Sequence, residues 1–162
     1  MNMNKIILPL AAVSAFAMSN VALAANPETG NAKVLIVTAL GVTETAEIDF
    51  GTITNEDGVC TMSSAGVVTN DGNQACSSSG NTIGSFDVTG TDDASVAITL
   101  TKSAAVGGVD YAPLLSSNDL TTGTITLSNT GTATVTVIGS ITMTSATDGQ
   151  RNIPYTFTAN YN

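Results

Sequence analysis

The chain has 162 residues, of which 43% are hydrophobic, and it carries 13 acidic residues, four basic residues and no histidine. A formal net charge of −9 repels nucleic acid and anionic lipid, which excludes a direct nucleic-acid role. The lack of histidine excludes Ser-His-Asp and Cys-His catalytic sites and histidine-bound metals.

The first 24 residues predict a secretory signal peptide. Lys5 precedes an apolar stretch from Ile6 to Met18, and Ala22 and Ala24 form a small-residue cleavage site. The apolar stretch is too short for a transmembrane anchor, and no later segment is apolar enough to span a bilayer. We therefore expect an exported protein whose mature chain has no membrane span.

A polar leader precedes the folded part of the chain. Residues 25–32 carry Pro and Gly among polar side chains, which predicts a flexible leader, and residues 33–162 predict one domain with a real core. The domain opens with a long extended run, KVLIVTALGVTETAEIDFG. Its segment Val34–Val37 is apolar on both faces, which predicts burial on both sides. Glu44 interrupts the apolar face further along, so we expect a bend or bulge near Gly41–Glu44.

The two cysteines, Cys60 and Cys76, predict a structural disulfide. Outside the cytosol such a pair usually oxidises, and closing a loop of this size contributes about 3 kcal/mol in the chain-entropy model. A redox or metal pair is less favoured, because the chain has no C-x-x-C motif and no histidine. We expect residues 54–82, rich in Ser, Asn, Gly and Asp, to form short strands and loops held by this disulfide.

Two strands with a period of two residues follow the cysteines. SFDVTG places Phe86 and Val88 on one face, and SVAITLT places Val96, Ile98 and Leu100 on one face. These five side chains are expected to point into the core. The Gly and Asp residues between the two segments predict a turn.

The second half of the chain predicts an irregular connection and three more strands. Residues 103–122 are expected to be irregular, and strands are expected at residues 123–129, 132–143 and 153–161. The sequence NTG at 129–131 is placed where a hairpin turn is needed. No helical periodicity follows the signal peptide, so the sequence predicts an all-β, immunoglobulin-like β-sandwich.

The last strand lacks an obvious neighbour. In IPYTFTANYN, residues 153–162, the apolar side chains alternate along the strand, with Ile153, Tyr155, Phe157 and Tyr161 on one face. The backbone N–H and C=O groups of such a strand need partners. Their partner could belong to the same molecule or to another one.

The sequence offers little chemistry for catalysis. Asp92–Asp93 and Glu56–Asp57 fall in turns with Gly nearby, where a calcium site or a glycosidase pair is one interpretation. Neither has EF-hand spacing, and Asp is common in turns because it hydrogen-bonds its own backbone. We expect no enzyme and no cofactor.

Three motifs resemble a family of secreted bacterial domains of unknown function: IDFGTI at 48–53, FDVTG at 86–90 and YTFTANYN at 155–162. That family carries an FG-T-I box early, an F-x-V-T-G strand midway and a terminal strand that ends in N-Y. More distantly, the pattern is similar to spore coat protein U-type domains and to subunits of archaic chaperone–usher pili, which also show an FG box after the first strand.

The resemblance implies an incomplete six-stranded sandwich that is completed by strand donation from a neighbouring copy. It also implies a periplasmic chaperone and an outer-membrane usher as partners. The leading hypothesis is a non-enzymatic structural subunit of a bacterial surface fibre or pilus, exported through the periplasm to the cell surface or the extracellular space. The expected donor side chains are Val34, Ile36 and Leu40, and the expected acceptor edge is Ile153, Tyr155, Phe157 and Tyr161.

Three alternatives remain open from the sequence. In a complete sandwich, residues 33–50 form one long first strand that switches sheets at Gly41. A monomeric secreted or surface adhesin would carry an exposed polar and aromatic cluster, with Asp110, Tyr111 and Asn118 as candidates. An enzyme would need a pocket that holds two close, buried carboxylates.

Overall fold

The structure is a computed structural model that describes residues 31–70, 76 and 79–162. The chain divides into two units, residues 1–34 and Leu35–Asn162, and all of the strands belong to the second. The described residues contain nine β-strands, and no helix among them is long and apolar enough to cross a membrane. The predicted signal peptide and most of the predicted leader lie outside the described residues.

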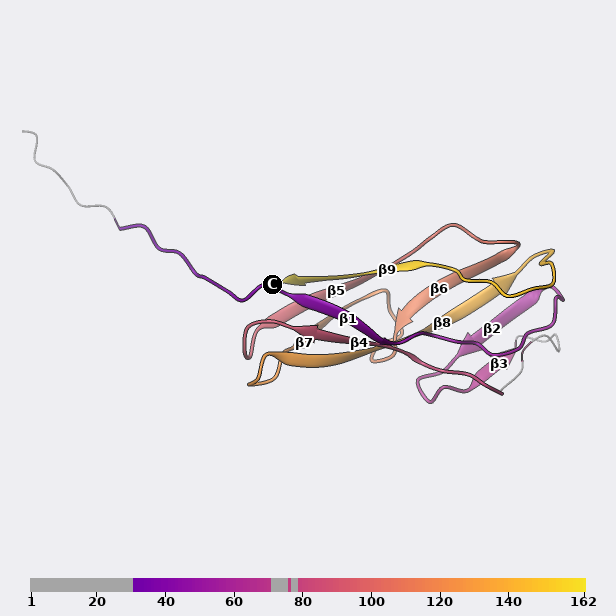
Figure 1. Cartoon of the computed structure of the whole chain (residues 1–162), viewed down its shortest axis with the longest axis horizontal. Helices are drawn as coiled ribbons and strands as arrows, with labels where there is room; N and C mark the ends of the chain where they lie inside the picture. Colours follow the sequence, from indigo (N-terminus) through magenta and orange to yellow (C-terminus); the bar gives the residue numbers. More distant parts are fainter. Residues whose placement is uncertain (1–30, 71–75, 77–78) are drawn as a thin grey trace, which may run out of the picture. The chain divides into compact units, whose positions relative to one another are not determined.

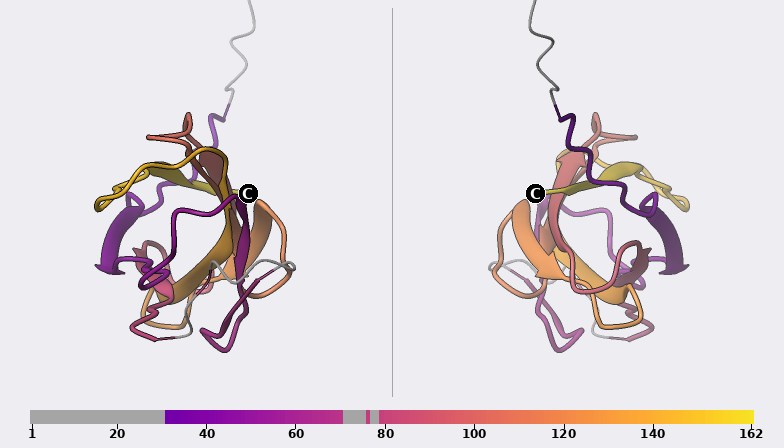
Figure 2. Two further views of the ribbon diagram at one scale, coloured as in Figure 1. Left: turned by 90° about the vertical axis from the view of Figure 1, so that its right-hand side faces the viewer. Right: turned by 90° about the vertical axis from the view of Figure 1, so that its left-hand side faces the viewer.

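The strands form two antiparallel sheets that pack as a β-sandwich, which confirms the predicted all-β sandwich (Figures 1 and 2). The larger sheet has the order β1-β4-β8-β2-β3, and β6 also pairs with β8. Its strands are β1 (Gly41–Ala46), β2 (Gly58–Met62), β3 (Val68–Asn70), β4 (Gly84–Thr89), β6 (Val109–Leu115) and β8 (Thr132–Met143). The smaller sheet has the order β7-β5-β9, with β5 (Ser95–Lys102), β7 (Thr122–Thr126) and β9 (Tyr155–Tyr161).

Alternating apolar side chains of β4 and β5 build one half of the core. Phe86 and Val88 of β4 are buried, as are Val96, Ile98 and Leu100 of β5. All five were expected on these faces from the period of two residues. A second core cluster lies around Tyr111, the Cys60 side chain and β8.

The long strand β8 joins the two halves of the larger sheet. Its first half pairs with β4, from Thr132↔Thr89 to Val137↔Gly84, and its second half pairs with both β2 and β6. The sequence predicted its bounds as 132–143, which the structure confirms.

The prediction of an irregular connection at residues 103–122 is wrong, because β6 lies within it. Val109, Tyr111, Pro113 and Leu115 alternate with less buried residues and face the core. Pro113 obscured this strand, since a proline inside a run argues against a central strand. It is tolerated here because β6 has β8 as its single partner in the described part of the chain.

The turn at 129–131 exists, but it does not join a hairpin. The Gly131 N–H donates to the Ser128 carbonyl at 2.9 Å, and the Ser128 N–H donates to the Thr132 carbonyl at 2.9 Å. The flanking strands β7 and β8 then enter different sheets. The turn is therefore a crossover between the two layers of the sandwich.

The extended run that opens the domain is shorter as a strand than its sequence suggests. Only Gly41–Ala46 forms β1, with a register shift between Glu44 and Ala46, which confirms an irregularity close to where Glu44 predicted one. Residues 35–37 are exposed rather than buried on both sides, with Leu35 84% and Ile36 86% exposed. Within the described residues of this single chain, no strand covers them.

Cys60 and Cys76 form the predicted disulfide, with Cα atoms 5.7 Å apart. Cys60 is fully buried on β2, and Cys76 makes an isolated antiparallel bridge with Ile53. The disulfide therefore ties β2 to Cys76, between β3 and β4, whose backbone in turn bridges Ile53 after β1.

Candidate functional site

A groove separates the free margins of β1 and β9. Among the described residues, β1 pairs only with β4, and β9 pairs only with β5. Figure 1 shows the two strands running in opposite directions along neighbouring margins of the two sheets. The groove between them has a volume of about 1140 Å³. Each margin thus presents an unpaired row of backbone groups beside an open space.

The groove has an apolar floor and two walls from opposite ends of the domain sequence. The floor consists of core side chains, namely Phe86, Val109, Tyr111, Ile141 and Met143. One wall is the β1 side, which contributes Val42, Glu44, Glu47, Ile48, Asp49, Phe50 and Ile53. The other wall is the β9 side, which contributes Ile153, Tyr155 and Phe157.

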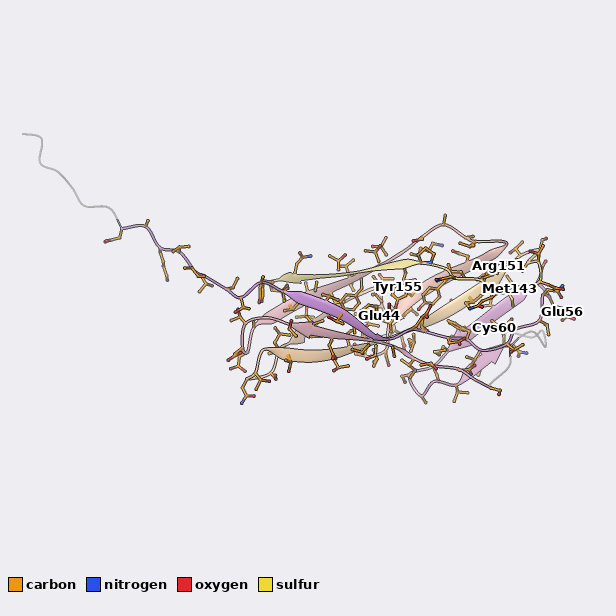
Figure 3. All side chains as sticks on the ribbon, in the orientation of Figure 1. Glu44, Glu56, Cys60, Met143, Arg151 and Tyr155 are labelled. Atoms are coloured by element: carbon orange, nitrogen blue, oxygen red, sulfur yellow. A yellow bond between two sulfur atoms is a disulfide. The ribbon has the colours of Figure 1, made fainter. Side chains whose placement is uncertain are left out.

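Aromatic rings link the β9 wall to the floor. The Phe157 ring stacks on Phe86 with centroids 4.5 Å apart, and the Tyr155 ring meets Phe86 and Tyr111 edge-on at 6.0 and 5.4 Å. Figure 3 shows Tyr155 pointing from β9 toward the interior, close to Glu44. Tyr155 therefore crosses the space between the two sheets, and its ring joins the floor of the groove.

The two tyrosine hydroxyls beside the floor differ in their partners. The Tyr111 hydroxyl donates to the Ile138 carbonyl at 2.8 Å, whereas the buried Tyr155 hydroxyl has no hydrogen-bond partner among the described residues. Burial raises the pKa of both hydroxyls well above the usual tyrosine value, and the nearby Glu44 and Glu47 raise that of Tyr155 further. Both side chains are therefore neutral at ordinary pH.

The β1 wall is held in place by backbone hydrogen bonds to Thr82 and by the packing of Phe50 and Gly51. The Asp49 and Thr82 backbones exchange two hydrogen bonds of 2.9 Å. Phe50 turns into the core and is 5% exposed. Gly51 has a φ of 71°, and a Cβ there would collide with the Ser79 carbonyl oxygen. The Phe-Gly pair of the IDFGTI motif is thus explained by an inward ring followed by a close backbone approach.

The end of the groove away from the β9 C-terminus is closed by side-chain hydrogen bonds. The Arg151 guanidinium donates to the carbonyls of Thr147 and Asp148 at 2.9 and 3.2 Å. The Asn55 amide donates to the Asp148 carboxylate at 3.0 Å, which connects the segment between β1 and β2 to the loop between β8 and β9. Figure 3 shows Arg151 near this end.

A second set of hydrogen bonds, which we call the Tyr161 clasp, joins Thr38, Thr91 and Tyr161 at the C-terminal end of β9, outside the groove lining. The Tyr161 hydroxyl donates to the Thr38 carbonyl at 2.6 Å and accepts from the Thr91 N–H at 2.7 Å. The Thr38 N–H donates to Thr91 Oγ1 at 2.8 Å. A Cβ on Gly90 would collide with the Tyr161 hydroxyl, so the clasp depends on glycine at this position.

The expected acceptor residues fall into two groups. Ile153, Tyr155 and Phe157 line the groove, whereas Tyr161 lies outside its lining and belongs to the clasp. Each of these four side chains, on β9 or just before it, is only half-buried.

The expected donor residues also divide. Val34 and Ile36 are 79% and 86% exposed, whereas Leu40 is partly buried and packs against the core cluster of its own chain. Leu40 is therefore already engaged in the single chain, unlike Val34 and Ile36.

The three residues expected to form an adhesin's binding cluster, Asp110, Tyr111 and Asn118, do not form an exposed patch. Tyr111 is 3% exposed and forms part of the groove floor. Asp110 forms an ion pair with Lys102 at 2.8 Å, and the Asn118 amide donates to the Thr122 carbonyl within its own turn. No group of three or more His, Cys, Asp or Glu side chains is placed to hold a metal ion in the part of the chain that the structure describes.

Sequence reasoning missed the β1 wall and the clasp. The wall had a signal, because Val42, Ile48 and Phe50 share the even-numbered positions of the first run. The clasp had none, since it joins Thr38, Thr91 and Tyr161 from three distant segments.

The model of a protein family, described as Domain of unknown function (DUF4402), matches residues 40–161. The chain belongs to this family. Its membership confirms the predicted resemblance to a family of domains of unknown function. The range matched by DUF4402 spans β1 to β9 and both walls of the groove, and it begins after the exposed apolar residues 35–37. No curated protein matches the chain.

Proposed function

We propose that this DUF4402 domain is a non-enzymatic structural subunit of a bacterial surface fibre, and that a strand donated by a neighbouring copy completes its sandwich. The observation that carries the proposal is the groove between the unpaired margins of β1 and β9. A β-strand is the occupant that such a groove suits best. It pairs its backbone with both margins and places alternate side chains on the floor.

The best donor in the chain is the apolar segment before β1. Leu35 and Ile36 are 84% and 86% exposed, and fully burying side chains of this size stabilises by about 1.5–3 kcal/mol each. An exposed segment of this composition is a liability in a free molecule. In the groove of a neighbour, Val34 and Ile36 lie on the same face of an extended strand and reach the floor together.

The sequence resemblances support the same role. The IDFGTI motif forms the β1 wall, FDVTG forms β4 under the floor, and YTFTANYN forms β9. All three motifs of the family resemblance therefore lie around one groove, and the FG box among them is also similar to that of spore coat protein U-type domains and archaic chaperone–usher pilus subunits. On this proposal the protein is exported, a periplasmic chaperone occupies the groove in transit, and an outer-membrane usher assembles the subunits.

Two complementary variants test the proposal. The donor-blocked chain carries Val34→Asp and Ile36→Asp and keeps its groove, whereas the groove-blocked chain carries Val42→Asp and keeps its donor segment. Val42 lines the groove and is 41% exposed. Val67, which is 50% exposed and lies outside the groove lining, provides the matched control Val67→Asp.

Light scattering coupled to size exclusion gives the readout on the mature chain from residue 25. We expect polymers from the unmodified chain and from Val67→Asp, and monomers from each blocked chain alone. Mixing the two blocked chains should give a one-to-one heterodimer, because only one donor and one groove remain functional. An unmodified chain that stays monomeric, or blocked chains that polymerise as it does, would contradict the proposal.

A further inference from the structure

The Tyr161 clasp fixes the point at which the exposed apolar segment leaves the domain. Both backbone polar groups of Thr38 are engaged, the N–H by Thr91 Oγ1 at 2.8 Å and the carbonyl by the Tyr161 hydroxyl at 2.6 Å. Two residues later, Leu40 packs against the core of its own chain. The backbone from Thr38 to Leu40 is therefore held at both ends.

This anchoring matters because the chain could otherwise fill its own groove. The free margin of β1 begins at Gly41, only three residues after Thr38. If the chain reversed over residues 38–41, the preceding apolar residues would pair with β1 as a hairpin and enter the groove. A reversal of that kind requires Thr38 to give up its extended path and its two hydrogen bonds.

The exposure of residues 35–37 is consistent with a clasp that keeps them out of their own groove. Residues 35–37 do not line the groove, and Ile36 is 86% exposed although an apolar floor lies within the same unit. Tyr161 holds this arrangement through its hydroxyl, which lies outside the groove lining. The hydroxyl also accepts from the Thr91 N–H at 2.7 Å, so the clasp links the end of β9 to the β4–β5 turn.

We propose that the Tyr161 clasp directs the donor segment away from its own groove, so that the occupant of the groove is a second copy of this chain. This inference rests on the proposed function, because it assumes that the groove accepts a strand. It assigns to Tyr161 a role different from that of the other β9 aromatics, which contact the occupant.

Removal of one hydroxyl group tests the clasp. Tyr161→Phe keeps the ring and deletes the hydrogen bonds to Thr38 and Thr91. Thr134→Val is the control, since it deletes a 2.8 Å hydrogen bond to Asp87 that lies outside both the clasp and the groove lining. Thr91→Val is a second clasp variant that removes the acceptor of the Thr38 N–H. The mature chains are refolded from denaturant at equal concentration, and the monomer-to-polymer ratio is measured by light scattering.

We expect Tyr161→Phe and Thr91→Val to raise the monomer-to-polymer ratio roughly tenfold, as expected for the loss of one or two hydrogen bonds. These monomers should protect residues 31–37 from proteolysis, because the segment occupies its own groove. Thr134→Val should keep the ratio of the unmodified chain.

The possible failures are distinguishable. If the unmodified chain polymerises and both clasp variants polymerise to the same extent, the clasp has no directing role and the proposed function stands. If the clasp variants are monomers but protease still cleaves within residues 31–37, the segment does not occupy its own groove and the clasp proposal is wrong. If the unmodified chain itself is monomeric, both proposals fall.

Discussion

Strands β5 and β9 pair with each other along seven residues, yet their inward side chains differ in burial. Val96, Ile98 and Leu100 of β5 are at most 4% exposed, whereas the inward side chains of β9 are all half-buried. Both strands alternate apolar and polar residues, so the pattern alone does not separate them. The difference follows from position, since among the described strands β5 has a neighbour on each side and β9 has one. Within the described residues, the β9 margin is therefore more open than the core around β5.

The largest expected effect comes from truncating one core side chain in each strand. In the donor-blocked chain, Ile98→Ala should lower the free energy of unfolding by about 2–5 kcal/mol, because it leaves a cavity in a closed core. Phe157→Ala should cost about 1–2 kcal/mol, because its half-exposed ring loses less burial. Urea denaturation measures both.

A saturating peptide of residues 25–37 sharpens this comparison. It should increase the cost of Phe157→Ala and leave that of Ile98→Ala unchanged, because only Phe157 lines the groove. Equal costs for the two variants without peptide would show that β9 is as closed as β5.

Alkaline pH should give the next largest effect. The pKa values of Tyr111 and Tyr155 are raised by burial, so the unfolded chain loses these protons first, near the ordinary tyrosine pKa of about 10. The contribution of these two tyrosines to the free energy of unfolding is therefore fully present below about pH 10. It is lost as the pH rises toward the folded-state pKa values. Urea midpoints measured from neutral to alkaline pH check this, and Tyr111→Phe and Tyr155→Phe should each remove part of the decline. A midpoint that is independent of pH above 10 would contradict the burial of both hydroxyls.

The smallest expected effect separates the same two tyrosines at neutral pH. Tyr111→Phe deletes a hydrogen bond to the Ile138 carbonyl and should cost about 1 kcal/mol. Tyr155→Phe deletes a buried hydroxyl without a partner in the described residues and should be neutral or slightly stabilising. Thermal unfolding of the donor-blocked chain resolves the pair. A larger loss for Tyr155→Phe would mean that its hydroxyl is hydrogen-bonded in solution.

The sequence predicted the parts of the fold that depend on short-range alternation. The inward faces of β4 and β5, the bounds of β8 and the Cys60–Cys76 disulfide all follow from local pattern or composition. Strand β6 was missed because Pro113 breaks a pattern that an edge strand tolerates. Local pattern also did not reveal that the turn at 129–131 crosses between sheets.

The candidate site was predictable only in part, because alternation along a strand can be read from the sequence and contacts between distant segments cannot. Tyr155 and Phe157 were assigned to an accepting edge because they alternate at the end of the chain, and they line the groove. Tyr161 follows the same period, but its hydroxyl meets Thr38 and lies outside the groove lining. Such a contact depends on how the strand ends meet in space, which no spacing along the chain encodes.

Hydrogen exchange on β9 tests the central claim most directly. The donor-blocked mature chain is exchanged with and without a synthetic peptide of residues 25–37, and a peptide carrying Val34→Asp and Ile36→Asp is the control. We predict that the native peptide slows exchange of amides in Gly41–Ala46 and Tyr155–Tyr161, the two margins of the groove, and leaves β5 unchanged. If neither margin gains protection at a peptide concentration that saturates any binding, the groove does not accept a strand and the account is wrong.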